Sequence, residues 1–101
     1  MFFGFFKLAI DTVWNVEQAL NASGVPAAAG SLPTYRVYDS DGNVVASGTC
    51  TAFDNGTLTG AYMFSFSTAS PQFVRGQQYH VAVSYTVSAA ARTGHHHFTV
   101  T

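Results

Sequence analysis

Between residues 79 and 100, apolar and polar side chains alternate on both sides of a short run of small residues. In the first half the apolar side chains occupy every second position from Tyr79 to Val87, and in the second half from His96 to Val100. A period of two on both sides of a short break is typical of an antiparallel hairpin with one buried face. We therefore expect a hairpin here, with residues 88–91 as its break, and strands in the rest of the chain.

The beginning of the chain follows a similar pattern. Every second residue is apolar over most of residues 5–16, which predicts a long first strand with Trp14 in the core. The pattern breaks at Thr12 and Val13, where we expect a bulge or a change from one sheet to another. A helix over residues 13–20 is the competing interpretation.

Turn residues divide the remaining sequence into short segments. The pair Asp41-Gly42 is typical of a two-residue hairpin loop, and this loop would place Val37 opposite Ala46 and Tyr38 opposite Val45. Six or seven strands at this spacing predict an all-β fold, an antiparallel β-sandwich of immunoglobulin-like type, with a small β-barrel as the alternative. We expect one domain over residues 1–101, in which the further strands cover residues 34–39, 44–52 and 61–67 and another turn covers residues 54–56.

Charge is scarce in this sequence. Four Lys and Arg residues and five Asp and Glu residues make up 9% of the chain, whereas about a quarter is usual in soluble domains. Four dispersed basic residues give no electrostatic footprint for nucleic acid. The apolar start is interrupted at Lys7, so we expect neither a signal peptide nor a membrane partner. We infer that other subunits cover much of the surface and that the protein is a homo-oligomer.

Two apolar segments are candidates for that contact. Phe2, Phe3 and Phe5 precede the expected first strand or lie on its opposite face, which predicts a contact arm over residues 1–5. The alternative is a terminus that folds back over the end of the sandwich. The second segment is the long connection over residues 17–32, because such a loop is commonly functional or ordered by a neighbour. Its candidate contact residues are Val25, Pro26 and Leu32.

Three consecutive histidines raise the question of a metal site. On a strand, His95 and His97 would share one face while His96 points to the other. With Tyr85 opposite His96, His80 would lie about 13 Å along its strand from the nearest position of the pair, and no third ligand would converge. We therefore expect no metal and no other cofactor, with His95 and His97 as weak candidates that instead form hydrogen bonds across strands or to a neighbouring subunit.

Catalytic patterns are absent from the sequence. There is no nucleophile elbow, no glycine loop that would hold a phosphate, and no paired acids. The single cysteine, Cys50, is expected to pack as a small apolar residue. The segment 39–43 fails as a calcium loop because Val44 and Cys50 occupy the positions of the required glycine and glutamate. We expect a protein that is not an enzyme.

Four segments resemble sequences of small immunoglobulin-like β-sandwich domains in virion proteins of tailed bacteriophages. They are Tyr35-Arg36-Val37-Tyr38-Asp39, Gly60-Ala61-Tyr62, Arg75-Gly76-Gln77-Gln78-Tyr79-His80-Val81 and Arg92-Thr93-Gly94-His95-His96-His97-Phe98-Thr99-Val100. The resemblance implies a non-enzymatic virion protein assembled in the host cytoplasm. It would be a capsid decoration (cement) protein that binds itself, the major capsid protein or another virion protein. The alternative is a receptor- or glycan-binding adhesin module of a phage fibre or baseplate.

Overall fold

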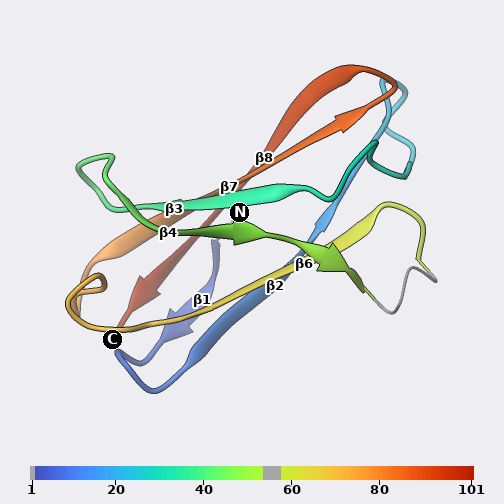
Figure 1. The fold of residues 1–101 in the computed structure, drawn as a ribbon. Coiled ribbons are helices and arrows are strands. Elements are labelled where there is room, and N and C mark those ends of the chain that lie inside the picture. Colours follow the sequence, from blue (N-terminus) through green and yellow to red (C-terminus); the bar gives the residue numbers. More distant parts are fainter. Residues whose placement is uncertain (1, 54–57) are drawn as a thin grey trace.

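The computed structural model describes residues 2–53 and 58–101, and within them the fold is all β with two packed sheets (Figure 1). The predicted turn at residues 54–56 lies outside the described residues. The strands are β1 (Phe2–Phe6), β2 (Thr12–Gln18), β3 (Thr34–Tyr38), β4 (Val44–Thr49), β5 (Thr51–Ala52), β6 (Ala61–Ser67), β7 (Gln78–Val87) and β8 (Ala90–Val100).

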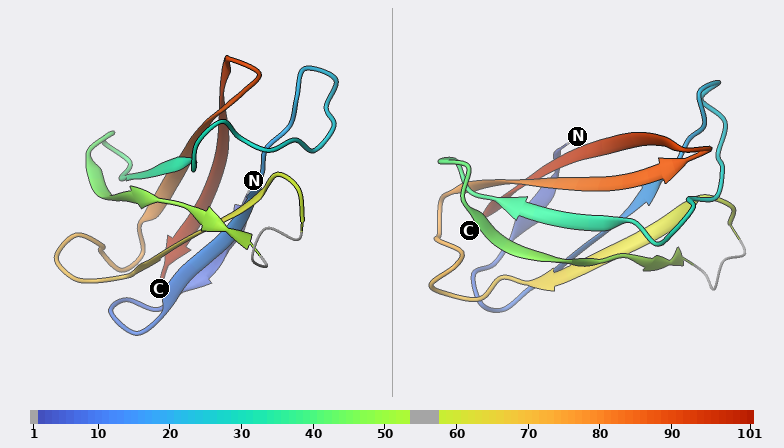
Figure 2. Two further views of the ribbon diagram at one scale, coloured as in Figure 1. Left: turned by 45° about the vertical axis from the view of Figure 1, so that its right-hand side comes forward. Right: turned by 45° about the horizontal axis from the view of Figure 1, so that its top comes forward.

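The strand order confirms the immunoglobulin-like sandwich. One sheet has the order β1-β8-β7-β3-β4 and the other β2-β6-β5, and the two sheets face each other across the core (Figure 2). This is the arrangement of a variable-type immunoglobulin domain, in which an extra strand joins the sheet that carries the last hairpin. Neighbouring strands are antiparallel except β1 and β8, which are parallel.

The start of the chain forms two strands where one was predicted. β1 belongs to the five-stranded sheet and β2 to the three-stranded sheet, so a change of sheet does occur, but over residues 7–11 and not at Thr12 and Val13, where it was expected. The hydroxyl of Thr68 donates to the backbone oxygens of Lys7 and Asp11, at 2.7 and 3.0 Å, and thereby fixes this crossing. The single long strand and the competing helix are therefore both wrong.

The core lies between the sheets and is built from aromatic rings and valines. Phe64 and Phe98 are almost fully buried, and each such ring contributes about 1.5–3 kcal/mol relative to an exposed one. Trp14 is the exception among the aromatic residues expected inside, because its side chain is 55% exposed on the outside of β2 while Val13 is buried. Five further rings are buried or packed against the core: Phe6, Tyr35, Phe66, Tyr79 and Tyr85.

The final hairpin forms, but in another register. Ser88 and Ala89 adopt positive φ angles of 50° and 66°, so they alone make the turn, as in two-residue hairpin loops with left-handed central residues. The strands continue through the small residues that were expected to form the break. His96 is therefore opposite Val81, four residues away from the predicted partner Tyr85.

The hairpin between β3 and β4 also differs from the prediction. Val37 is opposite Ala46 as expected, but Tyr38 is opposite Val44 because the register shifts between these pairs. The amide of Gly42, which has a φ of 86°, donates to the carbonyl oxygen of Asp39, which gives a longer loop than two residues. The predicted strand over residues 44–52 is divided at Cys50, where the chain passes from β4 to β5 in the other sheet.

Candidate binding face

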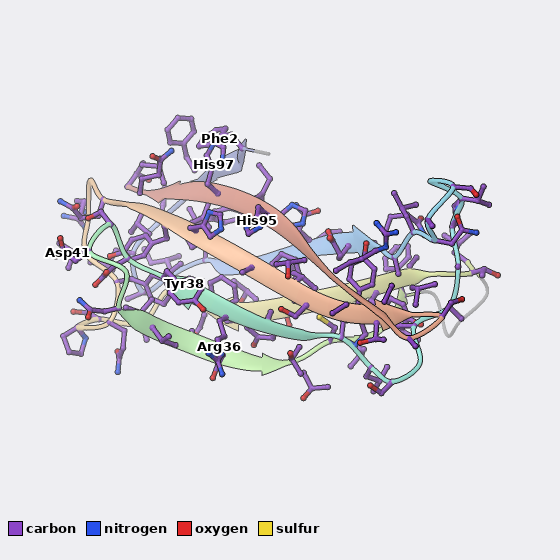
Figure 3. The ribbon with its side chains drawn as sticks, turned by 90° about the horizontal axis from the view of Figure 1, so that it is seen from above. Phe2, Arg36, Tyr38, Asp41, His95 and His97 are labelled. Atoms are coloured by element: carbon purple, nitrogen blue, oxygen red, sulfur yellow. The ribbon has the colours of Figure 1, made fainter. Side chains whose placement is uncertain are left out.

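The five-stranded sheet has one side packed on the core and one side that faces solvent, which we call the outer face. It consists of alternate side chains of β1, β8, β7, β3 and β4, and Figure 3 shows it from above. Those five strands contain two charged residues, Arg36 and Arg92. Arg36 is exposed on the outer face, whereas Arg92 has the same parity as the buried His96 and Phe98. The outer face is therefore nearly free of charge.

Aromatic and imidazole rings cross the outer face from β1 to β3. The ring centroids of Phe5 and Phe2 are 5.2 Å apart, and those of Phe2 and His97 are 5.3 Å apart. On β8, β7 and β3, the ring centroids of His80 and His95 are 4.9 Å apart, and those of His80 and Tyr38 are 6.5 Å apart. We call this set the aromatic band: Phe5, Phe2, His97, His95, His80 and Tyr38. It joins four strands into one surface.

The predicted contact arm is the edge strand of this sheet. A register shift between Phe2 and Phe5 lets both side chains point outward, with exposed fractions of 41% and 66%. Phe3 was expected on the outside as well, but it points inward, and its ring contacts those of Phe98 and Phe64 at 5.5 and 6.2 Å. Two of the three predicted phenylalanines are therefore available to a partner.

The histidines are closer together than the sequence indicated. His80 is paired with His97 in the sheet, and its Nε2 lies 2.8 Å from Nδ1 of His95. The predicted separation of about 13 Å was wrong because the hairpin register was wrong. Burial lowers the pKa of His80, and its neighbours His95 and His97 lower it further, so the neutral imidazole is favoured.

A hollow lies beside the aromatic band, next to the turn between β3 and β4. Its volume is about 310 Å³, and a second hollow of about 420 Å³ adjoins it through Asp39, Ser40 and Tyr79. Backbone amides that donate to the carboxylate lower the pKa of Asp39, the amide of Asn43 above all. The first hollow thus combines an anionic carboxylate with amide and imidazole groups, and its lining is Asp39, Ser40, Gln78, Tyr79, His80 and His97.

The second predicted contact segment lies elsewhere in the fold. Val25 and Leu32 are 53% and 49% exposed, and Pro26 is also exposed, on the irregular connection of residues 19–33. The amide of Gly30 in this connection donates to the backbone oxygen of Thr86. That position on β7 is six residues from the level of the aromatic band, about 20 Å along the strand. The two predicted segments therefore do not form one surface.

The described part of the chain offers little support for a metal site within one copy, a reactive cysteine or a membrane-spanning helix. No group of three or more His, Cys, Asp or Glu side chains within it is arranged to hold a metal ion. Cys50 is fully buried, and burial, followed by the negative charge of Glu17, raises the pKa of its thiol to about 11. Such a thiol is a poor nucleophile near neutral pH. Across residues 2–53 and 58–101, no helix is long and apolar enough to cross a membrane.

A buried polar pair escaped the sequence analysis. Nε2 of His96 lies 2.6 Å from Oε2 of Glu17, and both side chains are almost completely buried. Glu17, which was expected in the loop, belongs to β2 and points into the core. A Cβ atom at Gly94 would overlap the Glu17 carboxylate, so the glycine makes room for it. The signal available in the sequence was the inward parity of His96.

The fold and this face define the class of the protein as an immunoglobulin-like β-sandwich with a weakly charged, aromatic outer face. No family model matches the chain, and no curated protein matches it either. Two solved structures are similar: CBM51-2 and INT domains from Clostridium perfringens ZmpB, and CBM51-2 in complex with GlcNAc and INT domains from the same protein. The TM-scores are 0.59 and 0.57 and the identities 20% and 19%, over 96% and 94% of this chain. The match spans less than a fifth of each of those chains, 18% and 17%, and it shows a shared fold.

Proposed function

We propose that this chain is a non-catalytic structural module that associates with copies of itself, or with a lattice of other proteins, through the aromatic band. The main support is that Phe2 and Phe5 are exposed at one edge of the outer face. Within the described strands of this sheet, Arg36 is the only charged residue that points outward. The central parts of protein interfaces are depleted in charge and enriched in aromatic residues. The outer face has this composition.

Association through this face would have modest strength for each contact. Covering the two phenylalanines removes apolar surface from water, at about 25 cal/mol for each Å². A contact of this kind acts best in a repeating assembly, because many linked copies raise the effective concentration at each site. The resemblance to bacteriophage virion domains supports such a setting, with a capsid lattice as the partner and decoration of the capsid as the role.

The test replaces surface side chains without removing β1. A truncation of residues 1–5 would delete a strand of the sheet, so the double variant F2S/F5S is the better probe. Ile10→Ser is the matched control, because Ile10 is 77% exposed but lies in the turn between β1 and β2. Sedimentation over a range of concentrations should show larger species for the natural sequence and for I10S, and a loss of them for F2S/F5S. A natural chain that stays monomeric at millimolar concentration refutes self-association through the aromatic band.

A second candidate function is glycan binding, as a carbohydrate-recognition module of an adhesin. The observation that favours it is the hollow beside the aromatic band, where a carboxylate, an amide and two imidazoles lie close to the half-buried ring of Tyr38. Rings and a few placed polar groups are the usual means of recognising small polar ligands. The similarity to a structure determined in complex with GlcNAc also favours a carbohydrate ligand.

This second candidate has its own test. The isolated chain is applied to a glycan array, and any glycan that binds is titrated against the variants Q78A and Q18A. Gln78 lines the hollow, whereas Gln18 lies on β2 in the other sheet. Loss of binding in Q78A alone supports a glycan site here. An array without signal at high protein concentration rules it out.

A further inference from the structure

We propose that His80 and His95 form one half of a transition-metal site, and that a second copy of the chain supplies the other half. The two rings come from adjacent antiparallel strands, β7 and β8, and face each other on the outer face. Their facing nitrogens, Nε2 of His80 and Nδ1 of His95, are 2.8 Å apart. The inference rests on the proposed function in one respect, because it uses the outer face as a surface for self-association.

The separation of the two nitrogens suits a shared metal ion. Imidazole nitrogens bind such ions at about 2.0–2.1 Å, so neighbouring ligands of a square-planar site are about 2.8–3.0 Å apart. Copper(II) and nickel(II) prefer this geometry, and the two nitrogens already have the required separation, although each ring has to turn so that its lone pair points at the ion instead of at the other nitrogen. Tetrahedral zinc(II) places its ligands about 3.3–3.4 Å apart, which the side chains reach by opening about half an ångström.

The protonation states also suit a metal. Neutral imidazole is the ligand form of histidine, because a ring nitrogen has to offer its lone pair to the ion. In the metal-free protein one ring donates its proton to the other across the 2.8 Å contact. When the ion replaces that hydrogen bond, each neutral ring retains one proton on its outer nitrogen. The exchange therefore needs a change of tautomer and no net release of protons.

Two ligands leave the coordination shell incomplete, and residues 2–53 and 58–101 offer no third. The ring of His97 packs against Phe2, and no described group of three suitable side chains converges on a metal position. Two copies that meet face to face about a twofold axis would contribute the same pair twice and complete a four-histidine shell. The surface around the pair favours this contact because it carries rings and almost no charge.

The experiment titrates the metal-free full chain with copper(II), nickel(II) or zinc(II) chloride and follows mass by sedimentation and stoichiometry by calorimetry. We expect one ion for two chains, at least a tenfold fall in the dimer dissociation constant, and reversal by EDTA. H80Q and H95Q should each abolish this effect, whereas the control Q18A, on β2 in the other sheet, should retain it. One ion for each chain without a change in mass, no binding, or an effect that survives in both H80Q and H95Q would overturn the inference.

The same experiment separates this inference from the proposed function. Self-association without added metal depends on Phe2 and Phe5, so it tests the proposed function by itself. An ion-dependent step that survives in F2S/F5S supports the histidine site even if the metal-free chain is monomeric. Conversely, metal-free association that no ion strengthens overturns the site and leaves the proposed function standing.

Discussion

Removal of the Glu17 carboxylate is the sharpest test of how this core is held together. In Glu17→Ala, His96 keeps its buried position but loses the partner of Nε2, while its Nδ1 already has no hydrogen-bond partner. A buried ring with two unpaired nitrogens is costly, at about 1–3 kcal/mol for each polar group left unpaired. Truncation to alanine also leaves a cavity where the Glu17 side chain was, and core truncations to alanine cost about 2–5 kcal/mol, so the combined loss is about 3–5 kcal/mol. We expect the free energy of unfolding to fall by this amount.

Two further variants separate the possible causes. Glu17→Gln keeps the volume and one acceptor oxygen for His96, so it should cost only about 1–2 kcal/mol. The double variant E17M/H96F removes both polar groups, and such replacements are often neutral or even stabilising. It should therefore be more stable than E17A, although it changes more atoms.

The assay is urea unfolding followed by circular dichroism, with thermal melts as a check. For a domain of this size, 1 kcal/mol corresponds to about 4–8 °C in the melting temperature. With a loss of about 3 kcal/mol and about 4 °C for each kcal/mol, E17A should melt at least about 12 °C below the natural chain. A loss below about 1 kcal/mol in E17A would refute the reasoning, because it would mean that His96 does not need its partner.

Three more predictions concern side chains in and around the core. Gly94→Ala should destabilise the fold by more than about 3 kcal/mol in urea unfolding, because its Cβ would overlap the Glu17 carboxylate, whereas Gly30→Ala, with its nearest contact at 3.8 Å, should change stability little. The thiol of Cys50 should resist labelling by a thiol reagent at pH 8 until the chain is unfolded. Because its pKa is raised from 9.0 to about 11 in the folded state, it stabilises the fold below pH 9 and this contribution is lost as pH rises through 11, so Cys50→Ala should flatten that part of the stability profile. Trp14, the chain's one tryptophan, should emit as a solvent-exposed indole that acrylamide quenches readily, and Trp14→Ser should alter the free energy of unfolding by less than about 1 kcal/mol.

The sandwich itself could be predicted because period-two alternation is a local property. The strands β6 and β7 show it residue by residue, and Tyr62, Phe64 and Val81 point inward as the pattern requires. Turn residues between such segments then limit the fold to a few all-β architectures. The predicted class is confirmed for this reason.

Register depends on turn conformation, which the sequence did not reveal here. Ser88 and Ala89 both adopt the left-handed conformation, although neither belongs to the residue types that favour it. The predicted break was therefore too long, and every cross-strand pair in the last hairpin was displaced. This displacement hid the contact between His80 and His95, which is the most specific feature of the outer face.

The orientation of β2 could not be inferred locally either. The alternation of apolar residues over residues 5–16 placed Trp14 on the inner face, and Glu17 was assigned to the following connection. In the fold, Glu17 is buried because it is paired with His96, which lies 79 residues further along the chain. Trp14 is on the opposite face of β2 and is therefore exposed to solvent. The decisive contact joins the two sheets, so no window of sequence along β2 contains it.

The parallel pairing of β1 with β8 also determines how the domain responds to a mechanical load. Phe2 lies beside His97 and Phe6 beside Val100, so the first and last strands run side by side in the same direction. A pull on the two ends in opposite directions slides one strand along the other and loads the hydrogen bonds between them together, in shear. The backbone contacts between Phe6 and Thr101 and between Leu8 and Thr101 add to this clamp. If this domain were part of a tether under tension, the load would act on all the hydrogen bonds between β1 and β8 at once. The two strands would therefore not be peeled apart one hydrogen bond at a time.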